Sequence, residues 1–138
     1  NGLGMGIISN RNIIKGFSSF AGEVGYMFTG DINTDNHESY APFEVAFKQS
    51  IKNKCSGEVI GRMLVNVICV LNPPIIVLGG GYASEKMLTD IKNYCVKHLP
   101  SLAIPGFDLV KNEEKFYFSG LVKKGYQKAD EAIRITKK

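Results

Sequence analysis

The sequence predicts an α/β fold in which a mixed sheet is flanked by helices. Ile75–Leu78 is a continuous run of strand-forming residues bounded by prolines and glycines, which is typical of a parallel strand covered on both faces. Helix and strand patterns alternate along the chain after an initial hairpin. This order indicates layers of helix and sheet joined by right-handed crossovers.

Length and composition indicate a single domain covering residues 1–138. A chain of this size can bury roughly 70% of its unfolded surface, so a core needs no disulfide or metal to support it. A hydrophobic content of 44% and a charged content of 22% are ordinary for globular proteins and indicate neither disorder nor a coiled coil.

The first elements are short. Residues 3–9 and 12–15 are rich in strand formers, and Asn10-Arg11-Asn12 between them predicts a hairpin turn, because asparagine tolerates positive φ. Residues 16–40 are rich in Gly, Ser, Asn and Asp, which predicts a long functional loop without regular structure.

Two helices are expected next. The first follows Pro42, where apolar and small residues recur at helical spacing, at Phe43, Ala46, Phe47, Ser50 and Ile51. The second, at about residues 58–71, is apolar nearly all round, which predicts burial on most sides. Asn72-Pro73-Pro74 ends it.

The remaining elements alternate in type. Ser84 is placed to cap a helix whose stripe consists of Met87, Leu88, Ile91, Tyr94, Cys95 and His98. Residues 107–110 read as a strand, and residues 120–135 as a closing helix. Its expected inward positions are Leu121, Val122, Tyr126, Ala129 and Ile133.

Composition also bears on location and partners. The longest apolar stretch, residues 59–71, is too short to cross a bilayer, and no secretory signal is present, so we expect a cytoplasmic protein without membrane contact. Cys55, Cys69 and Cys95 suggest free, mostly buried thiols. The lysines behind the net charge of +4 are spread along the chain, which favours a solvated surface over a nucleic-acid site.

Two glycine-rich segments are candidate ligand loops. In Gly2-Leu3-Gly4-Met5-Gly6, missing side chains would let backbone N–H groups approach a phosphate, although tight strand packing would also explain the glycines. Gly79-Gly80-Gly81 follows the predicted strand at its carboxyl end, where α/β sheets bind ligands; a turn requiring positive φ is the alternative.

Glu23 is the candidate carboxylate. It lies between Gly22 and Gly25 in the long loop, where it could accept two hydroxyl hydrogen bonds, as carboxylates in sugar sites do. A charged residue on a loop surface is the alternative.

The glycine spacing resembles a known family. The positions are Gly2, Gly4, Gly6, Gly16, Gly22 and Gly25, followed after Asn72-Pro73-Pro74 and the strand by Gly79, Gly80 and Gly81. Together they resemble the ROK family, which contains bacterial sugar repressors and sugar kinases. The resemblance covers essentially the whole chain. It implies the carboxy-terminal lobe of the actin-like ATPase (ribonuclease H-like) fold.

The resemblance also implies site residues. It assigns sugar binding to Gly22 and Glu23. It also assigns a nucleotide site, functional or vestigial, that consists of a phosphate loop at Gly2 and Gly4 and an adenosine loop at Gly79, Gly80 and Gly81. Most family members have a zinc-ligating histidine at the position of Tyr26 and cysteines shortly after it. Because residues 28–42 contain no cysteine, we expect no zinc and no other metal site.

Two functions follow from the resemblance. One is the sugar-effector-binding and dimerisation lobe of a transcriptional repressor, and the other is the carboxy-terminal lobe of an ATP-dependent sugar kinase. Departures from the family pattern at Asn1, Met5 and Tyr26 favour the repressor, because phosphoryl transfer needs tightly placed phosphate contacts.

Either function would require parts outside this chain. We expect the amino-terminal lobe with its catalytic aspartate, and any DNA-binding domain, to be absent, so the chain alone has no catalytic residues and no enzyme activity. No cofactor is expected, except ATP if the parent is a kinase. The expected partners are a small sugar and a second copy of the chain, with DNA bound only through the absent domain.

Overall fold

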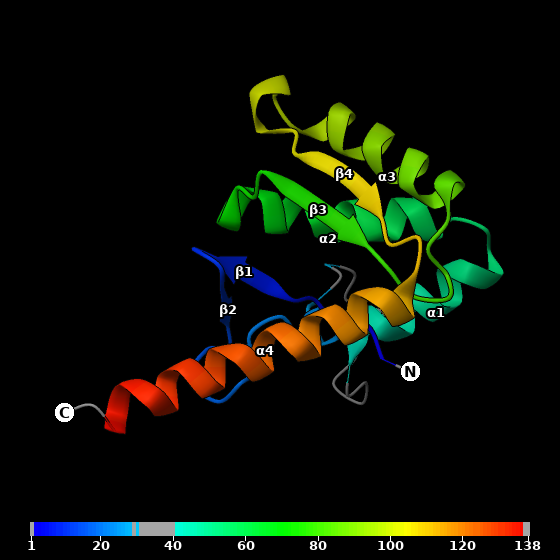
Figure 1. Cartoon of the computed structure of the whole chain (residues 1–138). Helices are drawn as coiled ribbons and strands as arrows, with labels where there is room; N and C mark the ends of the chain where they lie inside the picture. Colours follow the sequence, from blue (N-terminus) through cyan, green and yellow to red (C-terminus); the bar gives the residue numbers. More distant parts are fainter. Residues whose placement is uncertain (1, 29, 31–40, 137–138) are drawn as a thin grey trace.

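The computed structural model describes residues 2–28, 30 and 41–136, and their side chains except those of 113, 125 and 127–136. Within these residues the protein has an α/β fold with three packed helices, a fourth helix that leaves them, and two small sheets (Figure 1). The α/β prediction is confirmed at this level.

The strands form two separate pairs. β1 (Ile7–Ser9) and β2 (Asn12–Ile14) pair antiparallel, and β3 (Ile75–Leu78) and β4 (Gly106–Leu109) pair parallel. The expected single mixed sheet is therefore not formed by the described residues, because each strand bonds only to the other member of its pair. The parallel direction predicted for β3 is confirmed.

The hairpin is also confirmed, with a shorter turn. Asn10 and Arg11 have φ of 50° and 65°, so both central residues are left-handed, as a two-residue hairpin turn of the primed type requires. Asn12 already belongs to β2.

The first two helices lie close to their predicted bounds. α1 (Pro42–Lys52) starts with a proline, whose fixed φ suits the first helical turn. α2 (Ser56–Leu71) ends at Asn72, whose φ of 42° is the left-handed conformation that terminates helices. The expected burial of α2 on most sides is wrong for its last turn, where Val70 and Leu71 are exposed.

The core lies where α3 (Glu85–His98) packs on α2. Ser84 caps α3 as predicted, since its Oγ accepts the Met87 N–H at 3.2 Å. The helices approach closely at Gly61, because a Cβ added there would lie 2.7 Å from the Cβ of Tyr94. The buried side chains of this core come from α1, α2, α3 and the loop before α1. They are Val24, Phe43, Phe47, Ile60, Met63, Leu64, Val67, Ile68, Ile91 and Cys95.

One face of the parallel pair rests on this core, as Figure 1 shows for α2 and α3 beside β3 and β4. Ile76 and Phe107 pack against it. The opposite face is open: Ile75 is 54% exposed and Val77 51% exposed. The prediction that β3 is covered on both faces is therefore wrong, because the described residues place a helical layer on one face only.

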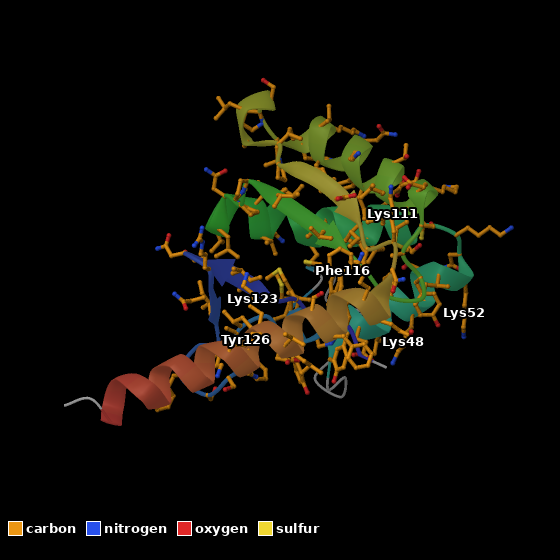
Figure 2. The ribbon with its side chains drawn as sticks, viewed as in Figure 1. Lys48, Lys52, Lys111, Phe116, Lys123 and Tyr126 are labelled. Carbon is orange, nitrogen blue, oxygen red and sulfur yellow. The ribbon has the colours of Figure 1, made fainter. Side chains whose placement is uncertain are left out.

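The closing helix, α4 (Glu113–Thr136), differs most from its prediction. It begins at Glu113 rather than at residue 120, because Asn112 Oδ1 accepts the Lys115 N–H at 2.9 Å and caps it. It then runs away from the packed helices (Figure 1). Leu121, Val122 and Tyr126 are exposed instead of facing inward, and Figure 2 shows Tyr126 on this helix.

Other predictions have mixed outcomes. In the described part of residues 16–40, Val24–Tyr26 form a short 3-10 helix, η1. Residues 29 and 31–40, Asn1 and the side chains of Ala129 and Ile133 lie outside the described part. A second 3-10 helix, η2 (Ser101–Ala103), precedes β4.

The cysteines also differ in environment. All three thiols are free, but only Cys95 is buried, and Cys69 is exposed. Among the described residues, every helix is too short or too polar to cross a bilayer.

Candidate functional site

Two of the predicted glycine motifs meet in the structure. The Met5 N–H donates to the Gly22 carbonyl at 2.7 Å. Gly22 has φ of 96°, and a Cβ added to it would lie only 1.8 Å from the Met5 carbonyl oxygen. Any side chain at Gly22 would collide with backbone, so this position requires glycine.

The same two segments approach each other again three residues further along the loop, at Gly25. A Cβ on Gly25 would lie 3.0 Å from the Leu3 carbonyl oxygen, and Gly25 and its neighbour Val24 are buried. Residues 2–6 and residues 22–25 therefore run side by side, and we call this arrangement the glycine crossing. It brings the predicted phosphate-loop residues Gly2 and Gly4 into the same region as the predicted sugar-binding residue Gly22.

Gly4 and Gly6 differ from Gly22. A Cβ on either would meet no other atom within 4 Å. The alternative explanation of tight strand packing therefore does not account for these two glycines.

Glu23 lies at the start of η1, and its side chain is exposed. Its backbone is held by two short turns: the Glu23 N–H donates to the Phe20 carbonyl at 3.3 Å, and the Glu23 carbonyl accepts the Tyr26 N–H at 3.1 Å. The backbone is thus fixed while the carboxylate remains accessible to a ligand from solvent.

A second carboxylate, Glu44 of α1, reaches the glycine crossing and was missed by the sequence reasoning. Its Oε2 accepts the Leu3 N–H at 3.3 Å, and a Cβ on Gly25 would lie 3.4 Å from the same oxygen. Its Oε1 pairs with Lys48 on the next turn of α1. The Lys48 hydrogen bond, followed by that from Leu3, holds the pKa of Glu44 below its ordinary value.

The sequence predicts only one of the two contacts of Glu44. Glu44 and Lys48 are four positions apart, which predicts a surface ion pair on a helix. The bond to Leu3 spans 41 positions of sequence and follows only from the fold.

Two aromatic residues, Phe20 and Tyr26, lie three positions before and after Glu23 in the sequence. The rings of Phe20 and Tyr26 have their centroids 5.2 Å apart at an interplanar angle of 52°. Both remain partly open to solvent, with exposed fractions of 55% and 42%.

The predicted adenosine loop lies elsewhere, at the carboxyl ends of β3 and β4. Gly80 has φ of 101°, so the turn explanation accounts for this glycine. Gly79 borders a cavity of about 420 Å³ whose other lining residues are Val110, Glu114, Tyr117 and Phe118. This cavity draws its walls from the residues directly after β3 and β4 and from the first turns of α4, and not from the glycine crossing.

Within the described residues, no three His, Cys, Asp or Glu side chains gather closely enough to hold a metal ion. No protein-family model matches this chain, and no curated protein matches it either. Function is therefore inferred from the residues and their geometry.

Proposed function

We propose that this chain is the sugar-effector-binding and dimerisation lobe of a ROK-family transcriptional repressor, built on the actin-like ATPase fold. The glycine crossing is the observation that carries this proposal. It holds the backbone of Glu23 in place with the carboxylate exposed, and it receives a second carboxylate from Glu44. Carboxylates are strong acceptors for sugar hydroxyl groups.

The same geometry argues against a phosphate at residues 2–6. The Leu3 N–H is already bonded to Glu44, and the Met5 N–H to the Gly22 carbonyl. A phosphate oxygen replacing the Leu3 contact would lie close to the Glu44 carboxylate. Like charges this close repel each other, which disfavours a phosphate at this position.

The alternative is the carboxy-terminal lobe of an ATP-dependent sugar kinase. The cavity at Gly79 favours it, because Tyr117 and Phe118 offer aromatic surface to a flat base and Glu114 offers a hydroxyl acceptor. ATP would be the cofactor in that case. We propose no zinc under either function.

Exposed surface supports the dimerisation part of the proposal. Apolar side chains are exposed on α4 (Phe116, Tyr117, Phe118, Leu121, Val122 and Tyr126) and on β3 (Ile75 and Val77). Exposed apolar patches of this kind mark interaction surfaces.

The test uses the full-length protein that contains this chain. We expect a pyranose sugar to bind in the absence of nucleotide and to weaken DNA binding, with no sugar-dependent turnover of ATP. Calorimetry, DNA mobility shift and a coupled ADP assay measure these three properties. Sugar-dependent ADP release at rates typical of kinases would establish the alternative instead.

A further inference from the structure

A carboxylate oxygen of the protein itself fills a space in the glycine crossing. Glu44 Oε2 accepts the Leu3 N–H at 3.3 Å. The same oxygen would lie 3.2 Å from a Cβ on Gly2 and 3.4 Å from a Cβ on Gly25. Because both positions are glycine, the oxygen has room to approach the backbone N–H. We call Gly2, Leu3 and Gly25 the anion cradle.

The two oxygens of Glu44 have different partners. Oε1 pairs with Lys48 on the next turn of α1, and Figure 2 shows Lys48 on this helix. A pair four positions apart forms from the helix alone. The bond from Leu3 is at the long end of the range for N–H donors and depends on the fold. The contact with Leu3 is therefore the one that yields when another acceptor arrives, while Lys48 keeps the carboxylate nearby.

The carboxylate also determines the charge of the anion cradle. While Glu44 is in place, its negative charge opposes any arriving anion, and the Lys48 cation is already paired. Without Glu44, the Leu3 N–H and the Lys48 ammonium group would both lack a partner. Both groups now contact one carboxylate, so both can reach one phosphate group of similar size. A backbone N–H and a lysine are common ligands of phosphate.

We infer that Glu44 is an internal occupant of the anion cradle: its carboxylate takes the place of a phosphate group, and the cradle binds phosphate only when Glu44 is displaced. This inference goes beyond the proposed function, because it assigns the exclusion of phosphate to one displaceable side chain. It does not depend on whether Glu23 binds a sugar. The contact between Glu44 and Leu3 is thus autoinhibitory.

The experiment is an NMR titration of the isotope-labelled chain with inorganic phosphate up to about 10 mM, followed at the Leu3 amide. Wild type should show no saturable shift. Glu44→Ala should bind phosphate at least about 10-fold more tightly than wild type, in line with a hydrogen bond to a charged group. Adding Lys48→Ala to Glu44→Ala should weaken this binding about 2- to 5-fold, because a charge contact at the surface is lost.

A matched control separates the cradle from the effect of a freed lysine. Asp90 pairs with Lys86 on α3 in the same four-residue spacing. Within the described residues, the Asp90 carboxylate accepts no backbone N–H. Asp90→Ala should therefore bind phosphate no more tightly than wild type.

A second variant guards against misfolding. Glu44→Gln keeps the length of the side chain and removes its charge, so it should bind phosphate with an affinity between those of wild type and Glu44→Ala. The Met5 amide, which is bonded to the Gly22 carbonyl, reports whether the glycine crossing is retained. If Glu44→Ala does not fold, Glu44→Gln decides the question.

Three results would overturn the inference. The first is that the folded Glu44 variants bind phosphate no more tightly than wild type. The second is that wild type itself shows a saturable Leu3 shift with the same affinity as the variants, so that Glu44 excludes nothing. The third is an equal gain in Asp90→Ala, which would attribute the binding to any unpaired lysine.

Discussion

Substitution of Gly22 by alanine tests the geometry of the glycine crossing. A residue with a Cβ at φ of 96° incurs strain of about 1 to 3 kcal/mol. The added Cβ would also lie 1.8 Å from the Met5 carbonyl oxygen, so the two segments must separate. Separation sacrifices the hydrogen bond between Met5 N–H and the Gly22 carbonyl, which is worth about 1 kcal/mol. We expect Gly22→Ala to lower the free energy of unfolding by about 2 to 4 kcal/mol, the sum of the strain and the lost hydrogen bond.

Urea denaturation followed by circular dichroism measures this loss, and the midpoint should fall by about 2 M. Two control variants separate the causes. Gly80 has a similar φ of 101° but open space around its Cβ position, so Gly80→Ala reports backbone strain alone. Gly4→Ala meets no neighbouring atom and should change stability by less than about 0.5 kcal/mol. If Gly22→Ala costs no more than Gly80→Ala, the close approach of the two segments is refuted.

Three further predictions concern the surroundings of the site. Glu44→Gln should lower stability at pH 7 by about 1 kcal/mol, because Glu44 is partly exposed and its pair with Lys48 is a surface pair. The pKa of Glu44 is lowered in the folded state, so this stabilisation is complete above the ordinary carboxyl pKa of 4.5 and is lost as the pH falls through the folded pKa. The denaturation midpoints of wild type and variant should therefore converge below pH 4.5. Cys69 should react quickly with Ellman's reagent and Cys95 only on unfolding, because Cys69 is exposed and burial raises the pKa of Cys95. If both thiols react at the same rate in native buffer, Cys95 is not buried in the core. Gly61→Ala should cost about 1 to 3 kcal/mol by forcing α3 away from α2, and an unchanged melting temperature would rule out their close packing.

Local signals in the sequence were sufficient for most elements. Asn10-Arg11-Asn12 predicted the hairpin turn, Asn72-Pro73-Pro74 the end of α2, Ser84 the start of α3, and the apolar run at Ile75–Leu78 predicted β3. Each of these features depends on residues a few positions apart, so that propensity and capping determine it.

Side-chain burial and long-range contacts could not be predicted from local sequence patterns. A β-branched run predicts a strand, but whether a second layer covers it depends on what packs there, and Val77 remains half exposed. The inward stripe assigned to α4 failed for the same reason. The helix cap at Asn112 is a local feature from which the start of α4 could have been predicted. The hydrogen bond from Leu3 to Glu44 joins segments far apart in the sequence, and no local pattern predicts that they meet.

An NMR titration of the isotope-labelled chain with a pyranose and with magnesium ATP tests the central claim most directly. The account predicts that the pyranose shifts the amide resonances of residues 22–26, that Glu23→Gln removes these shifts, and that ATP leaves the Leu3 and Met5 resonances unchanged. Saturable shifts of Leu3 and Met5 with ATP, without any response of residues 22–26 to the sugars, would contradict it.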